Sequence, residues 1–176
     1  LMHGDPQLWH DLCTRLTQIS AAFLKVQVEA GASAVQLFDS WAGMLSAADY
    51  QRFVAPHSAR VLAEVAGYGV PRIHFGVGTG ELLPAMSEAG SEVMGVDYRV
   101  PMDAAAERVS ARVLQGNLDP ALLFAGGDVV RSEVVRIKAE AKRAMDEGTA
   151  TGHIFNLGHG VLPTTDADAV TEAVRI

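Results

Sequence analysis

The chain has 176 residues, of which 49% are hydrophobic, and this is enough to build the core of one ordinary folded domain. Its 14 basic and 21 acidic residues give a formal net charge of −7, which argues against a nucleic-acid-binding protein because such proteins usually present a basic face. A strongly anionic ligand would have to be met by a few arginines concentrated at one site.

The first expected element is a long helix that begins at Pro6. Asp5 is a typical N-cap before a proline in the first helical turn, and Gly31 closes the helix. Cys13, in this helix, is the only cysteine of the sequence, so no disulfide can form within the chain. We interpret it as a buried structural thiol. Apolar residues recur at spacings of three and four and predict one apolar face of the helix: Leu8, Leu12, Leu16, Ile19, Phe23 and Val26.

Beyond this helix, apolar strands alternate with helices. Strands are expected at 33–40, 72–76, 92–97, 112–116 and 153–157. Helices are expected at 46–67, with a kink or break at Pro56, and at 80–89, 102–108, 128–147 and 166–175. The alternation predicts an α/β chain with five parallel strands, organised as a single domain over residues 1–176.

Polar residues or glycines follow every one of the five strands. The strand ends read FDSWAG, HFGVGTG, GVDYR, QGNLDP and NLGHG. In parallel α/β proteins, ligands bind at the carboxyl ends of the strands. An open nucleotide-binding sheet concentrates its ligand contacts at one switch point, so the even distribution of polar ends favours a barrel.

A nucleotide-binding loop is the alternative interpretation of the second strand end. Gly76, Gly78 and Gly80 form a glycine-rich turn, and Asp97 follows at the end of the next strand, with Asp119 as a further acidic candidate. This spacing suits a methyltransferase that uses S-adenosylmethionine, or a Rossmann-type domain. The loop alone is a weak signal because glycines are common wherever a strand turns tightly into a helix.

Taken together, the segments LFDSWAG, HFGVGTGELL, GVDYRVP, LQGNLDPALL and FNLGHGVLP resemble the uroporphyrinogen decarboxylase family, in this order and spacing. The resemblance implies a partial (β/α)8 TIM barrel, with the five strands as strands four to eight, in the C-terminal half of the enzyme. The opening LMHGDPQLW is not typical of a natural start, and we expect an N-terminal part before it. The GVGTG loop then becomes a barrel turn, and Asp97 a rim residue.

The resemblance also implies a function. Enzymes of this family are carboxy-lyases that convert the four acetate side chains of uroporphyrinogen III to methyl groups, giving coproporphyrinogen III for porphyrin and heme biosynthesis. They use no metal and no organic cofactor. The resemblance further implies a homodimer of complete subunits, with the tetrapyrrole as its partner. The sequence has no 18-residue apolar run and no signal peptide, so a cytoplasmic setting is expected, with no membrane partner and, given the net charge, no nucleic-acid partner.

Three residues match substrate-binding positions of the family. Ser40 and His159 match residues that contact substrate carboxylates, and Phe38 lines the same wall. His159 lies between two glycines and has no apolar surface to fill, which favours a functional role. The catalytic groups, which are arginines, an aspartate facing the pyrrole N–H groups and a tyrosine, are expected upstream of Leu1.

The chain alone is therefore expected to be inactive. It is also expected to self-associate through its unpaired outer strands, 33–38 and 153–157, because five strands cannot close the barrel. Val35 and Leu37 are expected to face its open interior.

Simpler roles stand beside these assignments. Ser40 suits a turn cap, and His74 suits a hydrogen-bonded interior residue. Polar residues at one strand end either satisfy loop backbone groups or contact substrate; these are Gln115, Asn117 and Asp119. The remaining candidates are two structural or exposed histidines and two rim aromatics, namely His57, His153, Trp41 and Tyr98.

Zinc-dependent corrinoid methyltransferases share the barrel fold and bind zinc through one histidine and two cysteines. His74 and His159 could contribute, but Gly76 stands where a cysteine is needed, and Cys13 lies far upstream in a helix. A metal site is therefore not expected.

Overall fold

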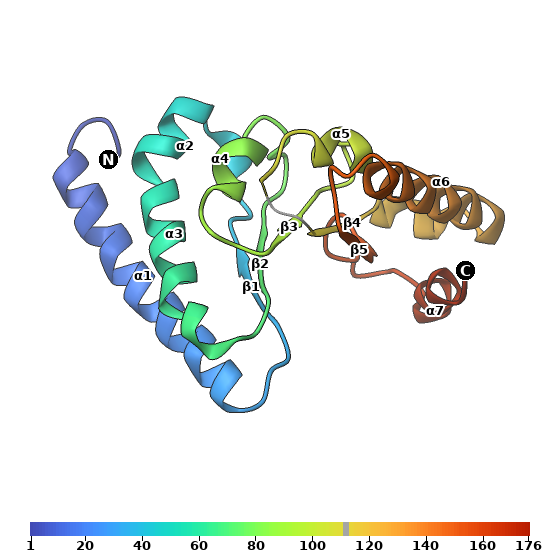
Figure 1. Ribbon diagram of the computed structural model, residues 1–176, viewed down its shortest axis with the longest axis horizontal. Coiled ribbons are helices and arrows are strands. Elements are labelled where there is room, and N and C mark those ends of the chain that lie inside the picture. Colours follow the sequence, from blue (N-terminus) through green and yellow to red (C-terminus); the bar gives the residue numbers. More distant parts are fainter. Residues whose placement is uncertain (111–112) are drawn as a thin grey trace.

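The computed structural model describes residues 1–110 and 113–176, and it consists of a curved sheet of five strands with helices packed along its outside (Figure 1). The strands are β1 (Val35–Phe38), β2 (Arg72–Phe75), β3 (Val93–Gly95), β4 (Val113–Leu118) and β5 (Gly152–Leu157). The α-helices are α1 (Pro6–Glu29), α2 (Ala47–Phe53), α3 (Ala55–Glu64), α4 (Leu83–Ser87), α5 (Met102–Ala106), α6 (Gly127–Asp146) and α7 (Ala167–Arg175). Short 3-10 helices in the described ranges are η1 (Ala42–Met44), η2 (Ala66–Tyr68) and η3 (Pro120–Phe124).

The α/β prediction is confirmed, and several predicted boundaries fall where the local signals placed them. Asp5 accepts a hydrogen bond from the Leu8 N–H at 3.0 Å and caps α1, and Gly31 follows the helix with a φ of 100°. Pro56 lies in the first turn of α3, so the expected break separates α2 from α3. The first residue of the strand expected at 112–116 lies outside the described residues.

All neighbouring strands are parallel, and their order in the sheet is the order in the chain, β1-β2-β3-β4-β5. A dinucleotide-binding sheet reverses its strand order at the point where the ligand binds. This sheet has no such reversal. Its order is that of a barrel wall, in which each strand is added beside the one before it.

The sheet is strongly curved. Gln115 on β4 donates a hydrogen bond from Nε2 to Oε1 of Gln36 on β1 at 2.9 Å. Neighbouring strands lie about 4.8 Å apart, so a flat sheet would hold β1 and β4 roughly 14 Å apart. The two glutamines meet because β1 and β4 bend toward each other, and they define the concave face of the sheet.

Val35 and Leu37 of β1 face the helices, whereas they were expected to face the barrel interior. Val35 is buried against α1 and α3, where it packs with Leu24 and Val61, and Leu37 packs against the same cluster. Since side chains alternate along a strand, Gln36 and Phe38 face the concave side. The expectation that Val35 and Leu37 face the barrel interior is therefore wrong by one residue of register.

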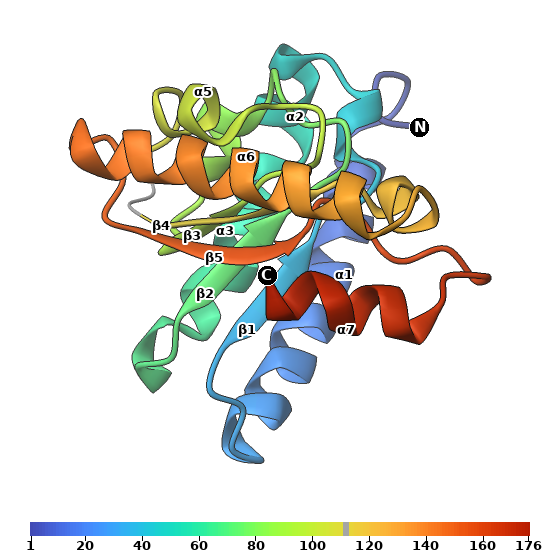
Figure 2. The ribbon, with the colours of Figure 1, turned by 90° about the vertical axis from the view of Figure 1, so that its right-hand side faces the viewer.

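The main core lies between the sheet and the helices that follow β2. Leu114 and Leu118 of β4 are fully buried in it, together with Met94, Met102 and Ile137. Figure 2 shows α6 running along the sheet beside β4 and β5, and both strands contact it.

Helix α1 presents its apolar stripe to solvent. It packs along α3 and buries Thr17, Ala21 and Leu24. The six residues of the predicted apolar face are 43–67% exposed; they are Leu8, Leu12, Leu16, Ile19, Phe23 and Val26. The periodicity thus identified residues that share a face, and α3 covers the adjacent face of the helix.

Candidate functional site

An open cavity of about 550 Å³ lies at the carboxyl ends of the strands. The loops after β1, β2, β3 and β5 all contribute to it, as the polar strand ends predicted. The residues that line it are Phe38, Ser40, Trp41, Gly43, Met44, Phe75, Val77, Gly78, Arg99, His159 and Gly160. Most of this wall is apolar, and Ser40, Arg99 and His159 supply its polar side chains.

The three residues predicted to bind substrate meet in this cavity. Phe38 ends β1 and is 62% exposed, with its ring edge-on to Phe75 at 6.0 Å between centroids. Ser40 follows two residues later, and His159 enters from the loop after β5, far away in the sequence. The fold thus brings them to one wall, while their contacts with a substrate stay predictions.

Glycines set the spacing of the loops around the cavity. A Cβ on Gly43 would lie 2.7 Å from the carbonyl oxygen of Gly78 and closer still to that of Val77. A Cβ on Gly158 would lie 2.8 Å from the Cα of Tyr98 and closer still to its nitrogen. The neighbouring atoms are backbone and cannot rotate away. The glycines of SWAG and NLGHG therefore allow loop backbones to touch.

The GVGTG loop is a strand-to-helix turn held by Asp97. Gly78 has a φ of 69°, and its N–H donates a hydrogen bond to the Asp97 carboxylate. The same carboxylate accepts hydrogen bonds from the backbone N–H of Arg99 at 2.9 Å and from Nη1 of Arg99 at 2.8 Å. Asp97 is 2% exposed, so it is a buried loop anchor, and its carboxylate is not presented at the rim or to a ribose.

A buried polar cluster lies behind Ser40 on the helix-covered side of the sheet. Nε2 of His74 lies 2.8 Å from the Asp39 carboxylate, and Nδ1 lies 3.1 Å from the carbonyl oxygen of Met86. Tyr50 and Ser58 donate hydroxyl hydrogen bonds to the same Asp39 oxygen at 3.2 and 2.8 Å. The interior role expected for His74 is confirmed.

The charge state of this cluster follows from its partners. Both ring nitrogens of His74 face oxygen acceptors, an arrangement that suits the doubly protonated ring. Burial raises the pKa of Asp39, but the hydrogen bonds from His74, Ser58 and Tyr50 outweigh it and hold that pKa below its usual range. Burial, followed by the Asp39 charge, raises the pKa of Tyr50, which keeps its hydroxyl a donor.

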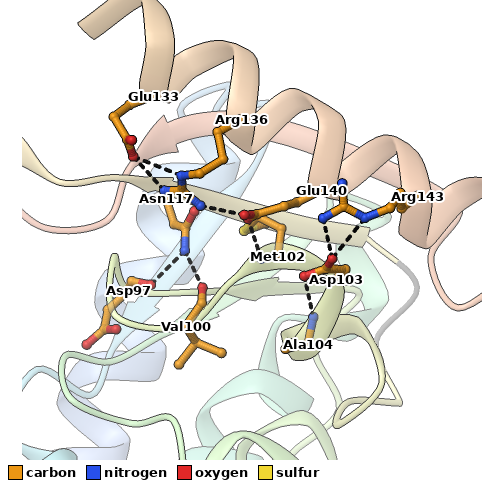
Figure 3. Close-up of polar contacts among 10 residues, drawn as sticks. All are labelled: Asp97, Val100, Met102, Asp103, Ala104, Asn117, Glu133, Arg136, Glu140 and Arg143. Carbon is orange, nitrogen blue, oxygen red and sulfur yellow. Dashed lines mark hydrogen bonds and ion pairs between the residues drawn. The ribbon is translucent and has the colours of Figure 1, made fainter. Parts of the chain in front are cut away.

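Asn117 holds the loop after β3 in place (Figure 3). Its Nδ2 donates hydrogen bonds to the carbonyl oxygens of Asp97 at 2.9 Å and Val100 at 2.6 Å. Helix α6 holds the far end of the loop, where Glu140 accepts a hydrogen bond from the Met102 N–H at 3.1 Å. Asn117 is 2% exposed and thus serves the protein backbone.

The other strand-end residues also have protein partners. Gln115 bonds to Gln36 on the concave face, and Asp119 accepts a hydrogen bond from the Ala121 N–H at 2.9 Å and caps η3. His153 lies 2.7 Å from the carbonyl oxygen of Gly116, and burial lowers its pKa. These contacts confirm the structural interpretation of His153 and favour it for Gln115 and Asp119.

A second open cavity, of about 540 Å³, lies on the other side of β1 among α1 and α3. Cys13 contributes to its wall, and burial raises the pKa of the thiol. His57 lies beside it, with Nε2 2.9 Å from Nδ1 of His10. Burial, followed by His10, lowers the pKa of His57. This pairing fits the structural role that the sequence allowed.

Residues 1–110 and 113–176 contain no group of three histidine, cysteine, aspartate or glutamate side chains that could hold a metal ion. No helix within the same ranges combines the length and the apolar character needed to cross a membrane. Both ring nitrogens of His74 already have protein partners, so it is not an open ligand.

Arg99 is the cavity residue that the sequence analysis missed. It enters from the loop after β3 and is half-exposed, with its guanidinium 4.3 Å from the centre of the Tyr98 ring. The available signal was a basic residue two positions after the acidic strand end, in GVDYR. The expectation of Asp97 as a rim residue did not include its hydrogen bonds with Arg99.

Comparison with known proteins agrees with the barrel interpretation. The model of the uroporphyrinogen decarboxylase family matches residues 1–176. A curated relative from Corynebacterium diphtheriae, named uroporphyrinogen decarboxylase, is 66% identical over 177 residues, which cover 100% of this chain and 51% of the relative. Relatives of the same name from Corynebacterium glutamicum and Streptomyces coelicolor are 64% and 62% identical, over 100% and 99% of this chain and 50% and 48% of their own lengths.

The chain thus spans about half the length of the curated relatives it matches. The nucleotide-binding alternative has no support, because the strand order lacks a switch point and Asp97 is occupied by its own loop. The match over all 176 residues, together with the sequential parallel sheet, shows that the chain belongs to the uroporphyrinogen decarboxylase family.

Proposed function

We propose that this chain forms part of the substrate cavity of an enzyme that decarboxylates uroporphyrinogen III to coproporphyrinogen III. The observation that carries the proposal is the convergence of Phe38, Ser40 and His159 on one open cavity at the strand ends. The family resemblance adds that the complete enzyme is a homodimeric carboxy-lyase that needs no cofactor, and we propose that it acts in the cytoplasm.

The cavity suits a ligand with apolar pyrrole rings that carry carboxylates. Phe38, Trp41, Met44 and Phe75 offer apolar surface, on which a tetrapyrrole would lie. Ser40 would donate its hydroxyl hydrogen to a carboxylate of the ring. The His159 imidazole has no hydrogen-bond partner within the part of the chain that the structure describes, and it would donate to a second carboxylate.

The chemistry requires one proton for each acetate. The carbon–carbon bond to the carboxylate breaks, CO2 leaves, and the electron pair passes into the pyrrole, which has first taken up a proton. The methylene then gains a proton to become methyl while the ring releases its added proton. Binding orients the acetate, and polar groups stabilise the charged ring.

The acid that faces the pyrrole nitrogens is proposed to come from the rest of the complete enzyme. Asp39 and Asp97 lie within two residues of the cavity residues Ser40 and Arg99, and the carboxylates of both are hydrogen-bonded to groups of the protein itself. The described side chains that line the cavity include no carboxylate. This segment would therefore bind and position, while the remaining part would stabilise the protonated pyrrole.

A hybrid enzyme tests the proposed function. The chain replaces the matching segment of the Corynebacterium diphtheriae relative, which is 66% identical to it, and formation of coproporphyrinogen is measured. We expect turnover close to that of the relative. A folded hybrid that neither binds a tetrapyrrole nor releases CO2 would overturn the proposal.

In this hybrid, His159→Ala is expected to lower kcat/KM by roughly 10- to 100-fold, because a hydrogen bond to a charged group contributes about 1.5–3 kcal/mol. His159 is exposed and flanked by glycines, so its loss should change the melting temperature little. His3→Ala, an exposed histidine outside the cavity, is the control and should leave turnover unchanged. If His159→Ala loses stability and keeps kcat/KM, the histidine is structural.

A further inference from the structure

Arg99 is the only permanently charged side chain among the described residues that line the cavity. It shares the cavity with Ser40 and His159, the two side chains proposed to bind substrate carboxylates. The chain as a whole carries a net charge of −7, so an anionic ligand gains little from its overall field. A local cation is what such a ligand requires.

The contacts of Arg99 leave most of its donors free. A guanidinium has five N–H groups, and only Nη1 of Arg99 reaches Asp97, at 2.8 Å. In the described chain, Arg99 has no other side-chain hydrogen bond. Arg143 offers a contrast, because both its Nε and Nη2 bind Asp103, at 3.1 and 2.6 Å.

Asp97 does not depend on the Arg99 side chain for its hydrogen bonds. Two backbone groups, the N–H of Gly78 and the N–H of Arg99, already donate to its carboxylate. An arginine that served only to neutralise Asp97 would be expected to use its paired nitrogens, as planar guanidinium–carboxylate pairs do. The single contact instead holds the guanidinium at the wall of the cavity and leaves its other nitrogens without a side-chain partner among the described residues.

Hydrogen bonds from Asn117 and to Glu140 fix the position of the loop that carries Arg99. Asn117 bonds to two carbonyl groups of the loop, and Glu140 bonds to the first helical N–H that follows it (Figure 3). The guanidinium also lies over the Tyr98 ring, 4.3 Å from its centre. These contacts reduce the entropy that Arg99 would lose when it binds a ligand.

We propose that Arg99 binds a side-chain carboxylate of the tetrapyrrole, on the same wall as Ser40 and His159. The inference rests on the proposed function and adds a specificity residue to it. Arginine suits this role because its remaining nitrogens present donors in the plane of a carboxylate. Asn117 and Asp97 then act as positioning residues for the arginine.

The test compares Arg99→Gln with the unchanged hybrid enzyme. We expect KM to rise roughly 10- to 100-fold, with kcat changed less than about threefold, because an arginine–carboxylate contact contributes mainly to binding. The dissociation constant of uroporphyrin, an oxidised ring that carries the same eight carboxylates, should rise by a similar factor when titrated on the chain itself and on the hybrid. Arg99→Lys should bind more tightly than Arg99→Gln but less tightly than the unchanged enzyme, because lysine keeps the positive charge but lacks the paired planar donors of the guanidinium.

Arg108→Gln is the matched control. Arg108 is also about half-exposed and lies outside the cavity, with its Nη1 3.9 Å from Glu81, so its removal changes the net charge equally. It should leave KM unchanged. Equal KM increases in both variants would overturn the proposal in favour of a general charge effect.

Stability measurements separate a binding role from a structural one. If the Arg99→Gln variant has a lower melting temperature but the same KM as the unchanged enzyme, the proposal is overturned. If Arg99→Gln fails to fold, Arg99→Lys decides, because it keeps the ion pair with Asp97 and should still bind less tightly. Failure of the unchanged hybrid to bind uroporphyrin would contradict the proposed function itself.

Discussion

Replacing His74 by leucine is expected to destabilise the fold by roughly 3–5 kcal/mol, the cost of removing one partner from a buried ion pair. His74 is fully buried, and its ring nitrogens contact the Asp39 carboxylate and the Met86 carbonyl. Leucine fills much of the volume but donates no hydrogen bond. The largely buried Asp39 would keep only the hydroxyl donors of Tyr50 and Ser58. Urea unfolding of this chain and of the hybrid measures the effect.

The same comparison has a defined pH dependence. The pKa of Asp39 is lower in the folded protein than in the unfolded chain. Its contacts therefore stabilise the fold fully at pH values above the ordinary carboxyl pKa of about 4. This stabilisation is lost as the pH falls through the lower pKa of the folded state. The difference between the unchanged protein and His74→Leu should therefore be larger at about pH 5 than in more acidic solution, where Asp39 becomes protonated.

Ser58→Ala is the control for this cluster. It removes one hydroxyl donor to Asp39 and leaves His74 in place, so the expected cost is only about 1 kcal/mol. If His74→Leu costs no more than Ser58→Ala, His74 is a neutral residue with an ordinary hydrogen bond, and the ion pair is absent.

Gly43→Ala is expected to cost about 3 kcal/mol, the upper part of the range for overpacking, because the added carbon would meet the backbone of Val77 and Gly78. The loops after β1 and β2 must separate to accept it. Since Gly43, Val77 and Gly78 all line the cavity, KM of the hybrid should rise together with the loss of stability. Urea unfolding and steady-state kinetics measure the two effects.

Gly160→Ala is the matched control in the same cavity wall. A Cβ on Gly160 meets no atom within 4 Å, and its φ lies outside the left-handed region. Its stability should therefore stay within about 0.5 kcal/mol of the unchanged protein. Equal effects of the two alanines would show that Gly43 matters for chain flexibility and not for loop contact.

The sequence predicted the features that depend on local signals. The alternation of strands and helices, the cap at Asp5 and the break at Pro56 were all predicted from residues close in the chain. The position of the cavity at the strand ends followed because parallel strands end on the same edge of a sheet. The resemblance supplied Phe38, Ser40 and His159, which the fold brings to one wall.

Features that depend on distant contacts were not predictable. The side of β1 on which Val35 lies depends on α1 and α3, and a shift by one residue reversed the assignment. The apolar stripe of α1 is real, but its exposure depends on how that helix lies against α3. Asp97 was expected at the rim because no local pattern reveals that Gly78 and Arg99 are its partners.

The sequential strand order has a consequence for how the chain folds. Each strand pairs with the strand made immediately before it, so the sheet grows at one edge and no strand has to be inserted between two earlier ones. Each step closes a loop of a few tens of residues, and the entropy of loop closure rises only slowly with length. The bond between Gln36 and Gln115 forms only after β2, β3 and β4 have been added. During synthesis this sheet can therefore grow in chain order, from β1 toward β5.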